Sequence, residues 1–106
     1  MRPSERQMAI WELLCRKRQA TAQSLAYEFG VSTRTIWRDI EQLTLSYPLE
    51  TVRGRYGGGV KIADWYHPTR SSLCPEQMQL LKRMAHFLHG DDLTIVNSII
   101  SQFAPR

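Results

Sequence analysis

The chain has 106 residues and a formal net charge of +4, with 42% hydrophobic and 23% charged residues. This composition is typical of folded globular proteins. It excludes the class of disordered proteins, which have too few apolar residues to form a core. No apolar run reaches the length of a membrane span and the N-terminus lacks the apolar region of a signal peptide, so we expect a cytoplasmic protein.

The first predicted helix begins at Ser4, a residue type that caps helices, and runs to about Arg18. Its inward stripe comprises Met8, Ile10, Leu13 and Leu14. Three consecutive cations, residues 16–18, end the helix. They stabilise the negative end of the helix dipole or contact phosphate, and the sequence leaves both interpretations open.

A second helix is predicted from Thr21 to Phe29, with Thr21 as its N-cap. Gly30 then supplies the backbone freedom that a sharp turn needs, and Ser32 caps a third helix that runs to Leu45. Two short helices joined by a glycine turn are typical of a helix-turn-helix.

The third helix has two unlike sides. A period of about 3.6 residues places three aliphatic residues together, Ile36, Ile40 and Leu43. Three charged residues fall on the opposite side, Arg34, Arg38 and Glu41. The helix is therefore expected to bury an aliphatic stripe and to present a largely cationic one. The alternative is an exposed face held by side-chain pairs such as Arg34 with Glu41.

Two β-rich segments, Leu49–Arg53 and Val60–Ala63, flank the glycine-rich segment Gly54–Gly59 and predict a hairpin. The glycines lack the Gly-Lys-Ser/Thr ending of a phosphate-binding P-loop and do not open a helix. They favour instead a loop tip that bends against a nucleic-acid backbone, or a plain solvated tip.

After a linker over residues 64–72, a helix is predicted from Pro75 to about His89, closed by Gly90. Its apolar face comprises Met78, Leu81, Met84, Ala85 and Leu88. A last helix runs from about Asp92 to Phe103, with an apolar face of Leu93, Val96, Ile99, Ile100 and Phe103. Two such helices cannot bury their faces completely against one another, so they must pack on the N-terminal part or on a second copy of the chain.

The order G-V-S-x-R-T-I-x-R-D-I-x-x-L over residues 30–43 resembles the DNA-binding domain of DeoR-type bacterial regulators and of the related WYL-domain regulators. The similarity extends over residues 4–63, because the glycine-rich segment stands where that family carries its wing. It implies a mainly α fold with a small β-hairpin. We expect a winged helix-turn-helix, three helices plus wing, over residues 1–64, and a linker with a helical pair over residues 65–106.

The resemblance implies a transcription regulator that binds double-stranded DNA sequence-specifically. The charge distribution agrees with it, because residues 1–62 hold ten cations against six acids and the remainder is balanced. The expected DNA-binding residues are Ser32, Thr33, Arg34, Thr35, Trp37, Arg38, Arg53, Arg55, Tyr56 and Lys61. Arg34 and Arg38 are expected to read guanine in the major groove. Trp37 stacks on a sugar or packs against a neighbouring segment or dimer partner.

Other functions find less support in the sequence. A winged-helix module that binds protein rather than DNA is the main alternative, and RNA binding is a weaker one because no stacking platform is evident. We find no arrangement of catalytic residues and expect no enzyme. Neither the cysteines nor the pair His86 and His89 has the partners of a metal site, so no metal or cofactor is expected. The expected partners are duplex DNA and a second copy, with no small-molecule effector.

Overall fold

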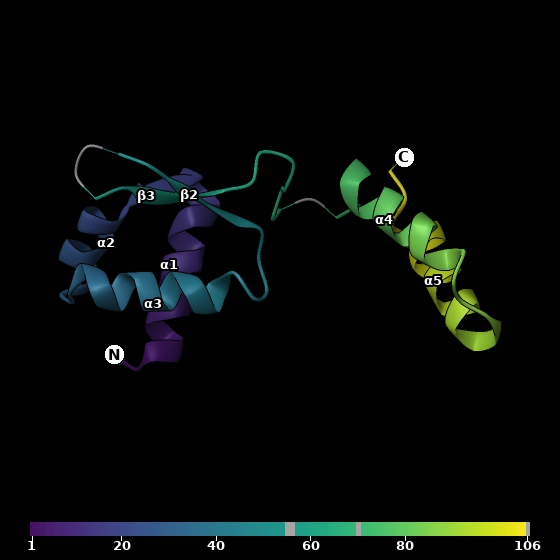
Figure 1. The fold of residues 1–106 in the computed structure, drawn as a ribbon, viewed down its shortest axis with the longest axis horizontal. Helices are drawn as coiled ribbons and strands as arrows, with labels where there is room; N and C mark the ends of the chain where they lie inside the picture. The colour runs from purple at the N-terminus through teal and green to yellow at the C-terminus, as the bar shows by residue number, and fades with distance from the viewer. Residues whose placement is uncertain (55–56, 70, 106) are drawn as a thin grey trace. The chain divides into compact units, whose positions relative to one another are not determined.

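The computed structural model describes residues 1–54, 57–69 and 71–105, which form two compact units, Met1–Asp64 and Trp65–Arg106 (Figure 1). The first unit contains α1 (Pro3–Lys17), β1 (Gln19–Thr21), α2 (Ala22–Phe29), α3 (Thr33–Leu43), β2 (Leu49–Val52) and β3 (Gly59–Ile62). The second unit contains α4 (Pro75–Ala85) and α5 (Gly90–Phe103). The described residues thus form a winged helix-turn-helix followed by a helical pair, as the sequence predicts.

Helix α1 begins earlier than expected. Its N-cap is Arg2, with Pro3 in the first turn, and the prediction that Ser4 caps the helix was wrong. Proline suits this position because it lacks an amide donor and its φ is already helical. Met8 also differs from the prediction, since it is 49% exposed. The buried aromatic residue of α1 is Trp11, which stacks on Tyr47 with ring centroids 3.8 Å apart.

The two caps of the helix-turn-helix are confirmed. The hydroxyl of Thr21 accepts a hydrogen bond of 3.1 Å from the Ser24 amide at the start of α2, and Ser32 caps α3 in the same way. Gly30 follows α2 with a φ of 64°, a conformation that glycine adopts without steric cost. The third helix ends at Leu43, before the expected end at Leu45, a residue that is 79% exposed.

The sheet has a third strand that the sequence did not predict. Strand β3 lies between β1 and β2, antiparallel to both, and Val60 pairs with Ala20 on one side and Thr51 on the other. The chain enters β1 directly from α1 through Arg18, whose φ is 69°. The Arg18 guanidinium donates to the carbonyl of Ala63 at 2.9 Å, and the Arg18 carbonyl accepts from the amide of Ile62. The end of α1 is thereby fastened to β3.

The core of the first unit lies between the three helices and the sheet (Figure 1). Its large buried side chains include Ile10, Leu14, Leu25, Ile36, Val60 and Ile62. Burial of each such side chain stabilises the fold by about 1.5–3 kcal/mol relative to exposure. This core fixes the side of α3 that carries Ile36 and leaves the opposite side open to solvent.

In the second unit α4 is shorter than predicted, since it ends at Ala85 and not near His89. Gly90 begins α5, with a φ of 59°, and does not close α4 as expected. The unit is closed by a hydrogen bond of 2.7 Å from the Leu73 amide to the Phe103 carbonyl. No helix within the described residues is long and apolar enough to cross a membrane.

Candidate nucleic-acid interface

Helix α3 is held on the first unit by its buried side. Ile36, Ile40 and Leu43 are buried there, as the periodicity predicts. Asp39 is buried on the same helix, with an exposed fraction of 2%. A buried carboxylate is costly unless it is paired and hydrogen bonded, so the partners of Asp39 decide whether this side of α3 is stable.

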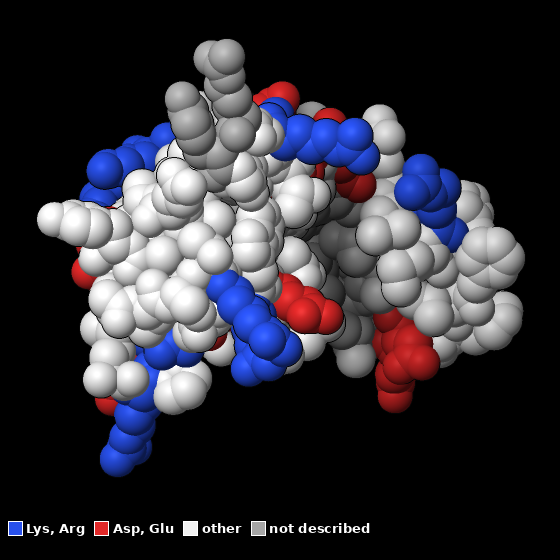
Figure 2. All heavy atoms as spheres, turned by 60° about the vertical axis from the view of Figure 1, so that its left-hand side comes forward, with Lys and Arg blue, Asp and Glu red and all other residues white. Residues whose placement is uncertain are grey.

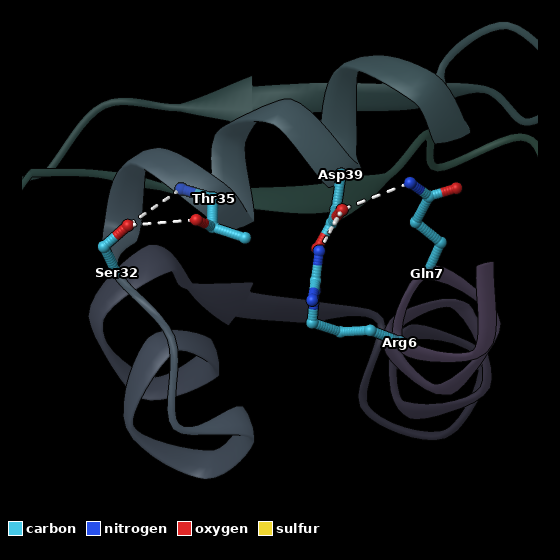
Figure 3. Close-up of polar contacts among 5 residues, drawn as sticks. All are labelled: Arg6, Gln7, Ser32, Thr35 and Asp39. Atoms are coloured by element: carbon cyan, nitrogen blue, oxygen red, sulfur yellow. Dashed lines mark hydrogen bonds and ion pairs between the residues drawn. The ribbon is translucent and has the colours of Figure 1, made fainter. Parts of the chain in front are cut away.

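Those partners come from α1 (Figure 3). Arg6 binds both carboxylate oxygens of Asp39: its Nε donates to Oδ2, and its Nη2 donates to Oδ1 at 3.0 Å. The amide of Gln7 also donates to Oδ1, at 3.1 Å. The hydrogen bond to Asp39 raises the pKa of Arg6 above its ordinary value, so the guanidinium stays charged. The pairing fixes α3 against α1 and thereby sets the direction in which Arg38, the neighbour of Asp39, projects.

The start of α3 is organised by Ser32 and Thr35 (Figure 3). The Ser32 hydroxyl accepts from the Thr35 amide at 3.1 Å and lies 3.1 Å from the Thr35 hydroxyl. Ser32 and the neighbouring Thr33 are exposed, whereas Thr35 is half-buried. The positive end of the α3 dipole is therefore open to solvent at the end where an anion would be stabilised.

Arg34 and Arg38 lie one helical turn apart on the exposed side of α3. Neither forms an ion pair with any residue that the structure describes. The alternative in which Arg34 pairs with Glu41 is therefore not seen. Two unpaired guanidinium groups on one helical stripe can each donate two parallel hydrogen bonds to an acceptor pair such as guanine O6 and N7.

The wing is the turn between β2 and β3, and its backbone is closely packed where it returns to the sheet. A Cβ on Gly59 would lie 2.4 Å from the carbonyl oxygen of Ala20, and one on Gly58 would lie 2.6 Å from that of Val52. Only glycine fits at these two positions. Arg53 leaves β2 with an exposed side chain. Arg55 and Tyr56, two further predicted contacts, lie outside the described residues.

Lys61, the remaining predicted contact, already has anionic neighbours. Its Nζ lies 3.8 Å from a carboxylate oxygen of Glu50 and 3.5 Å from one of Asp64. Two acids beside one cation leave this spot with an excess of negative charge. The surroundings of Lys61 are thus less favourable to phosphate than those of Arg34 or Arg38.

Trp37 lies on the side of α3 that faces the wing. It lines a hollow of about 400 Å³ together with residues of β2 and of the turn that follows: Thr51, Val52, Arg53, Gly54, Gly57 and Gly58. A second hollow, of about 170 Å³, joins Trp37 to Thr33, Gly57 and the first residues of α2. The indole is half-buried, so part of it packs against neighbouring residues and part of it is exposed to solvent.

Figure 2 views the molecule from the side on which α2 lies in Figure 1. The blue side chains of Lys and Arg form separate groups on this face, divided by uncharged surface, and acidic side chains stand beside some of them. On this face the cations are therefore not gathered in one patch.

Comparison with known proteins agrees with this geometry. The HTH domain family matches residues 6–61, more than half of the chain. The chain belongs to the HTH domain family. Over 75 residues it is 41% identical to an uncharacterized HTH-type transcriptional regulator, YobV, of Bacillus subtilis (strain 168). That alignment covers 70% of this chain and 24% of YobV, so the HTH chain spans about a quarter of this relative. No solved structure matches. The DeoR-type or WYL-type subdivision stays a prediction.

The sequence did not predict the residues that hold the buried side of α3 in this HTH domain. These residues are Asp39 and its partners Arg6 and Gln7. A signal was present, because Asp39 falls at the edge of the aliphatic side of the third helix, where an unpaired acid would be costly. The partner could not be named, since 33 residues separate Asp39 from Arg6.

Proposed function

We propose that the chain is a transcription regulator that binds double-stranded DNA in a sequence-specific manner. Helix α3 enters the major groove, and the wing lies on the adjacent backbone. Arg34 and Arg38 contact base edges, while Ser32, Thr33 and Thr35 contact phosphate or a thymine methyl group. On the wing, Arg53, Arg55 and Tyr56 contact the phosphate backbone. The protein acts where its DNA is, in the cytoplasm, and no effector or cofactor is part of the proposal.

One observation carries the proposal: two unpaired arginines project from a helix whose opposite side is fixed. Family membership supports it, and so does the name of YobV, which is that of a transcriptional regulator. Neither the family nor this relative points to a protein-binding role instead. We assign Lys61 a minor part, because Glu50 and Asp64 already neutralise it.

The first test replaces Arg38 by Ala. The variant is expected to bind its selected duplex about 1–3 kcal/mol more weakly and to lose base preference at one position, because a bidentate contact to one base pair is removed. The measurement is selection from a random duplex library with the wild type, followed by anisotropy titration of both proteins at several salt concentrations.

Two variants serve as controls. Lys61→Ala removes the same charge from a site that has carboxylates beside it and is expected to leave the affinity nearly unchanged. Lys82→Ala removes an exposed cation from the second unit, on the side of α4 away from Leu80 and Met84. If the wild type binds no duplex at low salt, the proposed function is wrong. If all three variants lose affinity equally, net charge and not Arg38 determines binding.

We further propose that the regulator is a homodimer joined through the second unit. Within the described residues no side chain of α4 or α5 is buried. Leu80 and Met84 lie one turn apart on α4 and are 49% and 45% exposed, and Phe87, just beyond the helix, is 82% exposed. A second copy would cover this apolar stripe by presenting the same stripe, as two-fold symmetry requires. Its two DNA half-sites would then lie about 34 Å apart or a multiple of that.

A further inference from the structure

Trp37 occupies a direction on α3 that is distinct from both the buried and the DNA-facing sides. Thr33 precedes it by four residues and shares its direction, whereas Arg34 and Arg38 are each displaced by one residue, about 100° further round the helix. Thr33 and Trp37 line one hollow with the start of α2, and Trp37 lines the larger hollow with the wing. Gly57 borders both hollows.

On one side, the described part of the wing is held by backbone contacts. The amide of Ala22, the first residue of α2, donates to the carbonyl of Gly58 at 3.1 Å. Gly59 lies against the backbone of Ala20 so closely that no side chain fits there. These contacts attach the wing to β1 and to the start of α2. Toward α3 the wing borders the hollow, and the large side chain that α3 contributes to its lining is that of Trp37.

We infer that Trp37 is a positioning residue that spaces the wing from helix α3. Across the hollow, the indole limits how closely Gly57 and Gly58 approach α3. The separation of the two elements then lets Arg53 reach the phosphate backbone while Arg34 and Arg38 lie in the adjoining major groove. A smaller side chain would let the turn settle toward α3 and would withdraw Arg53 from the duplex. The DNA contacts in this inference rest on the proposed function. The placement of the indole beside the wing does not.

The inference differs from a direct contact of Trp37 with DNA. A residue that stacks on a sugar contributes its own binding energy, whatever Arg53 does. A residue that positions Arg53 contributes nothing once Arg53 is removed. A double-mutant cycle separates the two cases, because only residues that act through one another deviate from additivity.

The DNA experiment uses the full chain and a labelled duplex selected from a random library by the wild type. In a plot of the logarithm of affinity against the logarithm of salt concentration, the magnitude of the slope falls by about 0.9 for each phosphate that the protein no longer neutralises. Trp37→Ala and Arg53→Ala are each expected to lower this slope by the equivalent of one phosphate. The double variant is expected to lower the slope by no more than either single variant does. Trp37→Phe is expected to keep the slope, and base preference at the position read by Arg38 is expected to persist in all variants.

A second experiment needs no DNA. Replacement of Trp37 by Leu removes an aromatic ring whose magnetic field shifts nearby amide signals. In the free protein the amide signals of Gly57 and Gly58 are expected to move, while that of Gly90, in the other unit, stays in place. Circular dichroism and urea unfolding establish that each variant is folded, and Trp37→Leu replaces Trp37→Ala in the DNA experiment if the latter unfolds.

The outcomes are distinct. Slope reductions that add in the double variant, or a slope that Trp37→Ala leaves unchanged, overturn the spacing role. Unmoved signals of Gly57 and Gly58 overturn it as well, whatever the DNA result. If those signals move but the wild type binds no duplex, the proposed function fails while the proximity of Trp37 to the wing stands.

Discussion

Among single residues, Asp39 supports the proposed interface although it is buried and cannot contact DNA itself. Its carboxylate accepts from Arg6 and Gln7 and so joins α3 to α1. The side chains of Arg6 and Asp39 are only 11% and 3% exposed. Water therefore replaces a missing partner poorly, and the next residue, Arg38, depends on this pairing for its direction.

Asp39→Ala is expected to lower the free energy of unfolding by about 3 kcal/mol, because the Arg6 guanidinium would be left partly buried without its counter-charge. Urea unfolding measures the change, provided that the dependence of the unfolding free energy on urea concentration is the same in both proteins. The matched control is Glu50→Ala, which removes a half-exposed acid at 3.8 Å from Lys61 and is expected to cost less than about 1 kcal/mol. Equal losses of stability in the two variants would contradict this account of Asp39.

At the scale of elements, the sheet depends on the close approach of β3 to β1. Gly59 pairs with Thr21 on β1 and with Val52 on β2. The approach is close because no side chain separates Gly59 from the Ala20 carbonyl. The strand pairing and the attachment of the wing thus rest on the same residue.

Gly59→Ala is expected to destabilise the protein by about 3 kcal/mol, because the added methyl group would meet backbone that cannot move aside. Gly57→Ala is the control. A Cβ on Gly57 meets nothing within 4 Å, but its φ is 86°, so the expected cost is only the backbone strain of about 1–2 kcal/mol. Thermal unfolding compares the two variants, and a smaller loss of stability for Gly59→Ala than for Gly57→Ala would count against this explanation.

At the scale of the whole molecule, the two units differ in how well they bury apolar residues. The first unit has a core of fully buried aliphatic side chains. In the second, the buried hydrophobic residue is Cys74, which precedes α4, and the described side chains of both helices remain accessible. An apolar surface of this kind is a usual site of association.

Met84→Glu is expected to shift the chain from dimer to monomer, because it places a charge within the exposed apolar stripe of α4. Gln79→Glu, which adds the same charge on an exposed position of α4, is expected to leave the dimer intact. Sedimentation velocity at several protein concentrations measures both. A wild type that sediments as a monomer at every concentration would show that the proposed homodimer is wrong.

The helix-turn-helix follows from local sequence alone, because its signals act over a few residues. Thr21 and Ser32 cap the helix that each precedes, Gly30 permits the left-handed turn between them, and the 3.6-residue period assigns Ile36 and Arg38 to opposite sides. Each of these preferences is a property of a short segment and holds wherever that segment folds.

The contacts between residues far apart in the chain come from packing, which the local sequence does not specify. Strand β1 has three residues, too few for a period, and forms because the distant strand β3 supplies its hydrogen bonds. Arg6 reaches Asp39, Lys61 lies between two acids, and Trp37 faces the wing for the same reason. These contacts depend on how separate elements pack, and no local preference in the sequence specifies that packing.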